Sequence, residues 1–451
     1  MSFPRYPSYR ESGIDWFDTI PVHWGLERLR HLVTLNPSKS EIAGLPDDTE
    51  VTFLPMEAIG ETGEIDVART RPLAELKNGY TYFADGDLVF AKVTPCFENG
   101  KGALIEGLLG GSGFGTTELT VLRPHAAADA QFLRWLIFSD LFRGPGSGEM
   151  LGAGGLKRVP DGFVADFPVP WPSPSERQTI SAFLNRETAK IDALVEEQRR
   201  LVELLKEKRQ AVISHAVTKG LDRTAPMKSS GVEWLGEVPA HWTVAAVDRR
   251  YDVQLGQMLN EERSQGEHLR PYLRVFDVQW DSINTDDLPF MNFLPAAQQR
   301  YRLEPGDLLV NEGGSYVGRS AIWRGDIEEC YYQKALHRLR AHDPSADTAE
   351  FFLFVMEMAT QIGVFIAQGN QTTIDHLTAE QFRATKFAFP PAEEQLQIAG
   401  ALREATKKST ALIRTAKNAA ALLSERRAAL ISAAVTGKID VRSTTNRAKA
   451  A

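Results

Sequence analysis

The sequence predicts an α+β protein made of two tandem pseudo-repeats, each a β-rich, mixed α/β globular part followed by one long α-helix. Three observations predict this fold class. Short motifs recur at a nearly constant offset, a long heptad-spaced segment closes each repeat, and short β-type runs between glycines and prolines fill the rest. The two long helices are expected to pair as an antiparallel coiled coil.

Composition restricts the class of protein. The chain has 451 residues, which suggests about three domains. Its 43% hydrophobic and 24% charged residues are typical of a soluble globular protein and exclude a disordered chain. It has no apolar run long enough to cross a membrane and no apolar signal core at the N-terminus. We therefore expect a cytoplasmic protein without a membrane partner.

The cysteine count and the net charge exclude further classes of protein. Only Cys96 and Cys330 are present, far apart, which excludes a disulfide framework and a classical zinc site and suits a reducing cytosol. The net charge of −8 argues against a broadly basic, nucleic-acid-coating surface, although it allows a local basic face.

The internal repeat is the most informative signal. The segments Ser12–Trp16 and Pro21–Trp24 return 218 residues later as Ser230–Trp234 and Pro239–Trp242. At the other end of each repeat, Arg209–Asp222 returns as Arg427–Asp440, again 218 residues on, and Gly86–Leu88 returns as Gly306–Leu308 at an offset of 220. Three landmarks in the same order at nearly one spacing argue against chance similarity. The period is too long for a solenoid.

The globular part of each repeat is expected to be rich in β-structure. Val51–Leu54, Leu88–Phe90 and Leu119–Leu122 are short runs of strand-forming residues among glycine and proline. Phe132–Phe142 and Glu350–Ile362 have helical spacing.

Long helices are predicted over about Glu176–Val217 and Glu394–Val435. Ser173 offers an N-cap for the first, with Pro174 at the first helical position and Glu176 three residues after the cap. The second follows Pro390-Pro391 without such a cap, and Gly220 and Gly437 follow the two ends. Apolar positions recur every seven residues. In the first helix they are Leu184, Ile191, Gln198, Leu205 and Val212, widened by Leu194, Val195, Leu201 and Val202, and in the second they are Leu402, Ser409, Ala416, Leu423 and Leu430, flanked by Ala405, Leu412, Ala419 and Ala433.

The two helices are complementary if they run antiparallel about Gln198 and Ala416. Ile191 then lies near Leu423 and Leu184 near Leu430, and small side chains meet larger ones. The alternative is that each helix simply covers its own globular part, but a helix of about 63 Å is too long for that, because it would extend beyond the globular part. Antiparallel pairing would hold two similar modules at a fixed separation and in opposite orientations. This arrangement suits DNA, whose half-sites on one face lie about 34–36 Å apart per turn.

In its repeated motifs the chain resembles the specificity subunits of bacterial type I restriction-modification enzymes. The resemblance is carried by Gly13–Trp16 with Ile20–Trp24, by the copy between Gly231 and Trp242, by Gly86–Phe90 and its copy, and by Pro174–Ile180 and Pro391–Ile398, which enter the long helices. It covers nearly the whole chain. No single motif is decisive, but the duplicated order is specific.

The resemblance implies a division into domains. Residues 1–172 and 220–390 would be two target-recognition domains, 173–219 and 391–437 two conserved spacer helices, and 438–451 a flexible C-terminal tail. Each recognition domain would read one part of a split, asymmetric sequence in double-stranded DNA. The subunit would be non-catalytic and would bind two modification subunits, which methylate adenine, mostly through the spacer helices. Restriction/translocase subunits would complete the complex. It would bind no cofactor itself, because S-adenosylmethionine, ATP and Mg would belong to the partners.

The residues themselves agree with a chain that has no catalytic residues and no metal site. An adenine methyltransferase would need an (N/D)PP(F/Y) loop, which Asn36-Pro37-Ser38 and Phe389-Pro390-Pro391 do not match, and a translocase would need a phosphate-binding G-x-x-x-x-G-K-[ST] loop. Gly110–Gly115 is glycine-rich, but no convincing amphipathic helix follows it. The alternatives are an enzyme of its own, a nuclease or methyltransferase on the same scaffold, and a pure coiled-coil scaffold, which would not need such large globular parts.

Base readout requires polar side chains on loops that enter a groove. Two loops in each repeat are candidates, Lys92–Lys101 and Gly152–Arg158 in the first, and Asn311–Ser320 and Gly369–Thr373 in the second, with Gln333 and Lys334 in addition. An ordinary solvated turn is the alternative for each loop. The predicted DNA-binding residues are Lys92, Thr94, Asn99, Lys101, Lys157, Arg158, Asn311, Ser315, Tyr316, Arg319, Gln333, Lys334, Asn370, Gln371, Thr372 and Thr373.

The acidic balance of the chain needs an explanation if it binds DNA. Basic residues of the first long helix, Arg199, Arg200, Lys206, Lys208 and Arg209, are expected to offer a local positive face. We further hypothesise that the modification subunits supply much of the charge that holds phosphates, so that the isolated chain binds DNA poorly. The four repeated tryptophans, Trp16, Trp24, Trp234 and Trp242, are interpreted as core or subunit-contact residues rather than as base-stacking ones.

Overall fold

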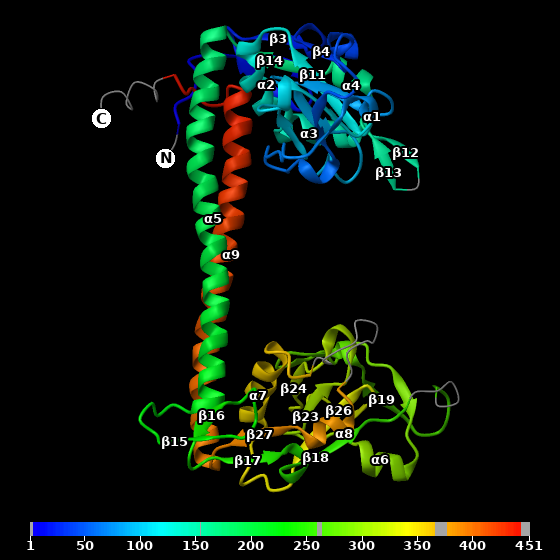
Figure 1. The fold of residues 1–451 in the computed structure, drawn as a ribbon, viewed down its shortest axis with the longest axis vertical. Helices are drawn as coiled ribbons and strands as arrows, with labels where there is room; N and C mark the ends of the chain where they lie inside the picture. The colour runs from blue at the N-terminus through cyan, green and yellow to red at the C-terminus, as the bar shows by residue number, and fades with distance from the viewer. Residues whose placement is uncertain (1–2, 154, 259–263, 366–376, 443–451) are drawn as a thin grey trace. The chain divides into compact units, whose positions relative to one another are not determined.

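The computed structural model describes residues 3–153, 155–258, 264–365 and 377–442. It divides into two compact units: unit 1 comprises Met1–Arg199 and Asn418–Ala451, and unit 2 comprises Arg200–Lys417. Two long helices, α5 (Pro174–Lys219) and α9 (Ala392–Val435), each contribute to both units (Figure 1). Their bounds agree with the predicted long helices to within two residues at each end.

Unit 1 is built from two four-stranded sheets and three strand pairs. One sheet has the strand order β6-β5-β10-β7 and the other β4-β11-β8-β9. The bounds of the two sheets are β5 Glu50–Leu54, β6 Thr70–Pro72, β7 Thr81–Ala84, β10 Ser112–Gly115, β4 Val33–Leu35, β8 Leu88–Ala91, β9 Gly102–Leu104 and β11 Leu119–Pro124. The pairs are β1 (Tyr9–Ile14) with β2 (Phe17–Pro21), β3 (Gly25–Arg28) with β14 (Pro168–Trp171), and β12 (Leu151–Ala153) with β13 (Leu156–Arg158).

Four short helices complete unit 1: α1 (Leu73–Leu76), α2 (Ala130–Ile137), α3 (Asp140–Gly148) and α4 (Asp161–Asp166). The predicted strands correspond to β5, β8 and β11. The segment Phe132–Phe142, predicted to be helical, is helical except at Phe138 and Ser139, where it is broken between α2 and α3. Ser139 has an extended backbone there, and its hydroxyl donates to the carbonyl of Leu136 at 2.6 Å. Such local bonding competes with helix propagation.

Unit 2 repeats part of this arrangement. Its four-stranded sheet, β18-β26-β23-β24, matches β4-β11-β8-β9 strand by strand, and β22-β19-β25 forms a second sheet. The bounds are β18 Tyr251–Leu255, β23 Leu308–Asn311, β24 Ser320–Ile322, β26 Leu336–Ala341, β19 Leu269–Leu273, β22 Phe290–Asn292, β25 Tyr331–Tyr332, β15 Met227–Ser229, β16 Glu237–Pro239, β17 Thr243–Ala246, β27 Lys386–Phe389, β20 Val278–Gln279, β21 Ser282–Ile283, α6 Pro295–Tyr301, α7 Ala349–Gln361 and α8 Ala379–Ala384. The predicted helix over Glu350–Ile362 is α7, displaced by one residue.

In each unit, opposite ends of the long helices pack into one core. In unit 1, Ile180, Phe183 and Leu184 of α5 share a buried cluster with Ile431, Ala434 and Val435 of α9, and Leu430 packs against it. Asp192 further along α5 pairs with Arg427 further back along α9, so the two segments run antiparallel. In unit 2, Ile213, Ala216 and Val217 of α5 lie in one cluster with Ile398, Ala399 and Leu402 of α9.

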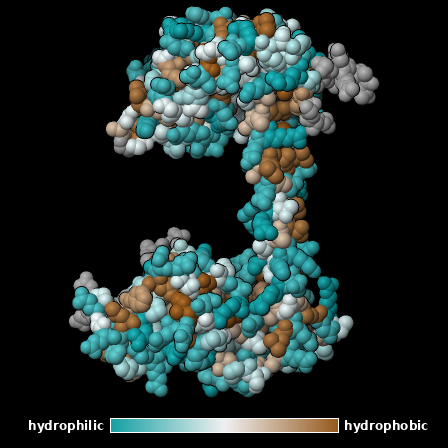
Figure 2. Space-filling model, turned by 180° about the vertical axis from the view of Figure 1, so that it is seen from behind, coloured by the Kyte–Doolittle hydropathy of each residue, from teal (hydrophilic) through white to brown (hydrophobic). Residues whose placement is uncertain are grey.

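The predicted apolar stripe is only partly correct. Leu184, Ile191, Val195 and Val202 are buried, but Leu194, Leu201 and Val212 are exposed, and Leu412 of α9 is 55% exposed. Two adjacent apolar residues cannot both face a single neighbour, because successive helical positions lie about 100° apart. In the structure Val195 and Val202 are the buried residues of these adjacent pairs, and Leu194 and Leu201 are the exposed ones. Figure 2 shows the resulting apolar surface along the exposed helical segments.

Two contacts recur in both units and account for the repeated motifs. Trp24 is buried, and its indole N–H donates to Glu176 at 3.3 Å while His23 contacts the same carboxylate at 3.1 Å. Trp242 and His241 make the same contacts to Glu394, at 3.1 and 2.7 Å. Each contact fastens a turn of the globular part to the first turn of a long helix. Trp16 alone of the four repeated tryptophans is markedly exposed, at 39%, and stacks on Phe167.

The second recurring contact explains the Gly-Asp-Leu motif. Gly86 and Gly306 have φ of +89° and +99°, a left-handed conformation that favours glycine. The aspartate that follows each of them is buried and accepts a bidentate pair from an arginine, Asp87 from Arg123 and Asp307 from Arg340, all at 2.7 Å. The motif is therefore a structural turn that carries a buried ion pair.

Buried His337 gives unit 2 an expected pH dependence. It lies on β26 with no exposed surface, and burial lowers its pKa from 6.5 to about 4. Because the folded-state pKa lies below the unfolded one, this contribution to stability is present above about pH 6.5 and is lost as the pH falls toward 4. We expect a loss of about 3 kcal/mol in the free energy of unfolding of unit 2 over that range.

Denaturant unfolding at pH 7 and pH 4.5 measures this effect. The variant His337→Thr should be less stable at pH 7 but should lose less of its stability on acidification. The control His342→Gln changes an exposed histidine and should keep the full pH dependence. If His337→Thr loses as much stability between pH 7 and pH 4.5 as the wild type does, His337 is not the source of the pH dependence.

Candidate nucleic-acid interface

The two predicted loops of unit 1 lie against each other. The backbone N–H of Thr94 donates to the carbonyl of Lys157 at 3.0 Å, and the N–H of Lys157 donates back to the Thr94 hydroxyl at 3.0 Å. The same hydroxyl donates to the carbonyl of Gly155 at 2.8 Å. Thr94 therefore fastens β13, the second strand of the β12–β13 hairpin, to the first loop.

The basic side chains of this junction have different degrees of freedom. The guanidinium of Arg158 makes a bidentate pair with Glu118 at 2.6 and 2.8 Å, and these hydrogen bonds raise the pKa of Arg158 and lower that of Glu118. Lys157 is exposed and Lys92 is partly exposed. Arg158 therefore supports the hairpin, while Lys92 and Lys157 remain candidates for phosphate contacts.

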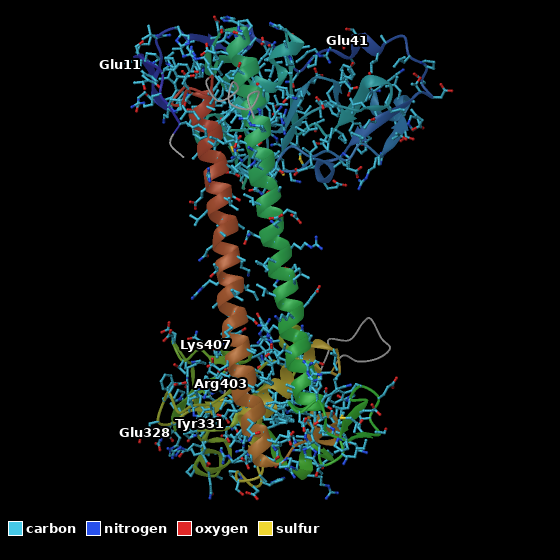
Figure 3. The ribbon with its side chains drawn as sticks, turned by 90° about the vertical axis from the view of Figure 1, so that its left-hand side faces the viewer. Glu11, Glu41, Glu328, Tyr331, Arg403 and Lys407 are labelled. Carbon is cyan, nitrogen blue, oxygen red and sulfur yellow. The ribbon has the colours of Figure 1, made fainter. Side chains whose placement is uncertain are left out.

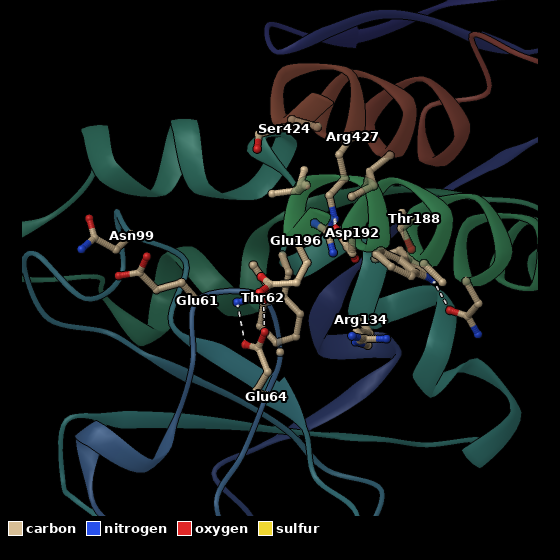
Figure 4. A pocket seen from close by; sticks show the side chains of 18 of the residues that line it. Glu61, Thr62, Glu64, Asn99, Arg134, Thr188, Asp192, Glu196, Ser424 and Arg427 are labelled. Carbon is tan, nitrogen blue, oxygen red and sulfur yellow. Dashed lines mark hydrogen bonds and ion pairs between the residues drawn. The ribbon is translucent and has the colours of Figure 1, made fainter. Parts of the chain in front are cut away.

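The far end of the first loop borders a different part of unit 1. Asn99 is exposed, and the ammonium of Lys101 donates to the carbonyl of Met56 at 3.1 Å. Asn99 also lines a pocket of about 700 Å³ between the globular part and the helices of this unit (Figure 4). The structure thus groups Lys92, Thr94, Lys157 and Arg158, while the side chain of Lys101 bonds Met56 and Asn99 lines the pocket.

The pocket itself carries mixed charge. Four arginines and four acidic residues line it: Arg134, Arg143, Arg199, Arg427, Glu61, Glu64, Asp192 and Glu196. Burial and the nearby Arg427 lower the pKa of Arg134, and Figure 4 shows Arg427 pointing toward Asp192. The opposite charges balance, so the pocket has no clear preference for an anion.

The equivalent loop of unit 2 uses the same backbone bonds with different side chains. In unit 1, Lys92 N–H donates to Glu118 O, and Val159 N–H to Lys92 O, both at 2.9 Å. In unit 2, Glu312 N–H donates to Ala335 O at 3.0 Å, and Leu377 N–H to Glu312 O at 2.6 Å. A lysine in one unit therefore stands where a glutamate stands in the other.

The predicted residues of unit 2 fall into three groups. Asn311, the last residue of β23, is fully buried and donates to the carbonyls of Val275 and Val278, so it could reach a base only if the end of this strand rearranged. Arg319 bonds Gln279, and its guanidinium lies 4.5 Å from the ring centre of Tyr316. Lys334 is exposed and Gln333 partly so, and their backbones pair with Gln257 and Leu273.

For five predicted residues the position of the side chain is not described. Ser315 lies in the 3-10 turn Gly314–Tyr316, and only the backbone of Ser315 is described. Asn370, Gln371, Thr372 and Thr373 lie outside the described residues. No observation tests any of the sixteen residues directly, so all of them stay predictions.

Three of the five residues of the expected basic face of α5 form ion pairs, while Arg200 and Lys208 are exposed and form none among the described residues. Arg199 pairs with Glu196 at 3.8 Å, Lys206 with Glu203 at 2.7 Å, and Arg209 with Glu357 of α7. On α9, Arg403, Lys407, Arg414 and Lys417 are exposed, and no ion pair is recorded for them among the described residues. Figure 3 shows Arg403 and Lys407 on one side of α9. Sequence reasoning missed this helix face, although its spacing of four, seven and three residues is a readable helical signal.

Features that would indicate catalysis are weak. No cluster of three or more potential metal ligands occurs among the described residues, and no described helix is long and apolar enough to cross a membrane. Gly110–Gly115 leads into strand β10 rather than into a helix, so it lacks the helix N-terminus on which phosphate binding depends.

Comparisons with known proteins show what part of this chain is similar to. Residues 291–421 match the family model described as "Type I restriction modification DNA specificity domain". Two Escherichia coli proteins are similar, the type I restriction enzyme EcoEI specificity subunit, 39% identical over 165 residues, and the EcoAI specificity subunit, 36% identical over 166 residues. Each match covers 36% of this chain and 27% of the relative, so the matched region spans about a quarter of the length of these relatives.

Two solved structures share the fold over most of the chain. A chain from a study of "complex assembly and conformational transition of the type I R-M system" matches with a TM-score of 0.69 at 20% identity, over 93% of this chain and 99% of that one. The HsdS subunit from Thermoanaerobacter tengcongensis matches with a TM-score of 0.56 at 17% identity, over 95% and 99%. Both E. coli relatives are specificity subunits, which agrees with the predicted non-catalytic subunit. The resemblance seen in the sequence is confirmed: residues 291–421 match a type I restriction-modification DNA specificity domain, 36% of the chain is similar in sequence to two type I specificity subunits, and its fold is similar to that of the HsdS subunit.

Proposed function

We propose that this chain is the DNA-binding specificity subunit of a type I restriction-modification system and recognises a bipartite, asymmetric DNA sequence. The observation that carries the proposal is that units 1 and 2 repeat one backbone scaffold while their loops differ. The same three-way backbone junction holds Lys92 in one unit and Glu312 in the other. Two similar scaffolds with different loop chemistry suit two different half-sites.

The spacing between the half-sites is assigned to the helices. We propose that α5 and α9 form one antiparallel coiled coil over their whole length, which would make the chain a tandem repeat with two recognition domains, 1–172 and 220–390, and two spacer helices, 173–219 and 391–437. The packing of opposite helix ends inside each unit supports this arrangement. A rigid spacer of this kind would fix the number of base pairs between the half-sites.

The partners follow from the same proposal. Two modification subunits would bind mainly on the spacer helices, where leucines such as Leu204 and Leu422 are exposed, and restriction/translocase subunits would join through the assembled complex. The chain itself would hold no cofactor, and S-adenosylmethionine, ATP and Mg would act on the partners. The proposed site of action is the bacterial cytoplasm.

Mapping methylated adenines tests the central proposal. The chain is co-expressed with type I modification subunits from its own source, and the DNA of the expression host is sequenced for methylated positions. A single motif with two specified halves and a constant unspecified gap is the expected result. Methylation that depends on the chain but follows a continuous motif would overturn the bipartite reading, and methyl transfer by the purified chain alone would overturn the non-catalytic role.

Salt dependence tests the predicted phosphate contacts. We expect Lys92→Ala and Lys157→Ala each to weaken binding of the assembled complex to the mapped site and to lower the slope of log affinity against log salt by about one. The control Lys77→Ala removes a lysine that is already paired with Asp47 and should leave the slope unchanged. The isolated chain is expected to bind far more weakly than the complex. Equally tight binding by both would show that the modification subunits do not supply the positive charge that holds the DNA phosphates.

A further inference from the structure

The β12–β13 hairpin of unit 1 exposes an apolar face. Leu151 is 70% exposed and Leu156 is 50% exposed, which is unusual for large apolar side chains that lie so close together. In the register of the hairpin, Leu151 faces Arg158 and Ala153 faces Leu156. Because alternate residues of a strand share a face and directly paired residues lie on the same face, Leu151, Ala153, Leu156 and Arg158 lie on one side and Lys157 on the other.

This exposed face is held in a fixed position. Strand β13 is bonded on one edge to β12 and on the other to Val93 and Thr94 of the first loop. Arg158 at the base of the hairpin is fixed by its bidentate pair with Glu118. Neither Leu151 nor Leu156 belongs to a core cluster among the described residues, and Figure 1 shows the hairpin standing away from the body of unit 1. The hairpin therefore does not stabilise the fold through these leucines.

The surroundings indicate what covers this face. Lys157 projects from the opposite side of the same hairpin, and Lys92 lies at its anchor. Cationic side chains beside an apolar ribbon are complementary to a DNA groove, where phosphates border the base edges. The major groove is wide enough for a two-stranded β-ribbon, and its apolar recognition feature is the methyl group of thymine.

We propose that Leu151 and Leu156 are specificity-determining residues: the β12–β13 hairpin enters the major groove, and its apolar face contacts thymine methyl groups in the half-site that unit 1 reads. The inference rests on the proposed function and adds a residue-level prediction to it. The half-site read by unit 1 must contain at least one A·T pair at a position that this hairpin reaches. Lys157 would hold the flanking backbone and would not select bases.

Replacing thymine by deoxyuridine removes only the methyl group and tests the contact directly. The assembled complex is titrated with duplexes that carry the mapped motif, with thymine or deoxyuridine in one half-site at a time. The wild type should bind roughly fourfold more weakly for each contacted methyl removed, the factor expected for burying one such group. The double variant Leu151→Ser/Leu156→Ser should bind the two duplexes equally and should lose discrimination in that half-site only.

The control and the contrary outcomes separate this inference from the proposed function. Leu109→Ser changes a leucine that is also 50% exposed in unit 1 but lies outside the hairpin, and it should keep the full sensitivity to deoxyuridine. A bipartite motif that is insensitive to deoxyuridine in both halves would overturn the hairpin contact and leave the proposed function standing. A serine variant that fails to bind a modification subunit while the free chain stays folded would show that a protein covers the face, and would also overturn it. The absence of any bipartite motif would remove the proposed function itself.

Discussion

Replacing Arg340 with leucine is expected to destabilise unit 2 by about 3–5 kcal/mol. The variant removes the bidentate partner of Asp307, whose carboxylate is 1% exposed, and leaves a buried charge without its cation. The remaining donor, the backbone N–H of Glu304, cannot neutralise that charge. Urea unfolding followed by hydrogen exchange at the amides of β23 and β26 measures the loss in the affected unit.

A matched surface pair provides the control for Arg340. Arg324 pairs with Asp281 at 3.2 Å, and both side chains are 47% exposed, so Arg324→Leu should cost less than about 1 kcal/mol. The variant Arg123→Leu breaks the equivalent buried pair and should destabilise unit 1 instead. Similar losses for Arg340→Leu and Arg324→Leu would contradict the importance of the buried turn.

Replacing Trp242 with alanine is expected to cost unit 2 about 3–5 kcal/mol as well. The side chain is 1% exposed and packs in the main core of the unit, so its removal leaves a large cavity. It also removes the indole N–H that Glu394 accepts at 3.1 Å in the first turn of α9. Thermal unfolding of the chain, with exchange at the amides of unit 2, measures the effect.

The exposed repeated tryptophan serves as the comparison. Trp16→Ala removes a stack on Phe167 at a position that is 39% exposed, and we expect a loss of about 1 kcal/mol. This difference would confirm Trp242 as a core residue. If Trp16→Ala were as destabilising as Trp242→Ala, burial would not be what distinguishes the two positions.

The long helices were predictable because their signals are local. Ser173, Pro174 and Glu176 mark the start of α5, and Gly220 follows its end at Lys219. The face of the helix was harder to predict. Leu194 and Val195 are adjacent and both apolar, and only the packing shows that Val195 is the buried one. The strand runs at β5, β8 and β11 were readable for the same reason as the helix ends, since glycine and proline bound them.

The candidate site depended on contacts that sequence cannot supply. The segment around Gly152 and Lys157 reads as a flexible glycine loop, yet it forms a hairpin because Thr94, far earlier in the chain, bonds its second strand. Asn311 reads as a polar loop residue, but it is the last residue of β23 and is fully buried. The exposed leucines of the hairpin were not singled out at all, because exposure is a tertiary property.

The composition of unit 1 has a consequence for synthesis on the ribosome. Its core requires Ile431, Ala434 and Val435, which are translated at least 260 residues after the strands of unit 1, since the last of these strands ends at Trp171 (431 − 171 = 260), whereas unit 2 is one continuous stretch. At ribosomal speeds of about 5–20 residues per second, the earlier half of the protein waits roughly 10–50 seconds with an open apolar seam. Nascent chains stalled before α9 should therefore bind chaperones through the half that emerged first, and release should follow only when the last helix arrives.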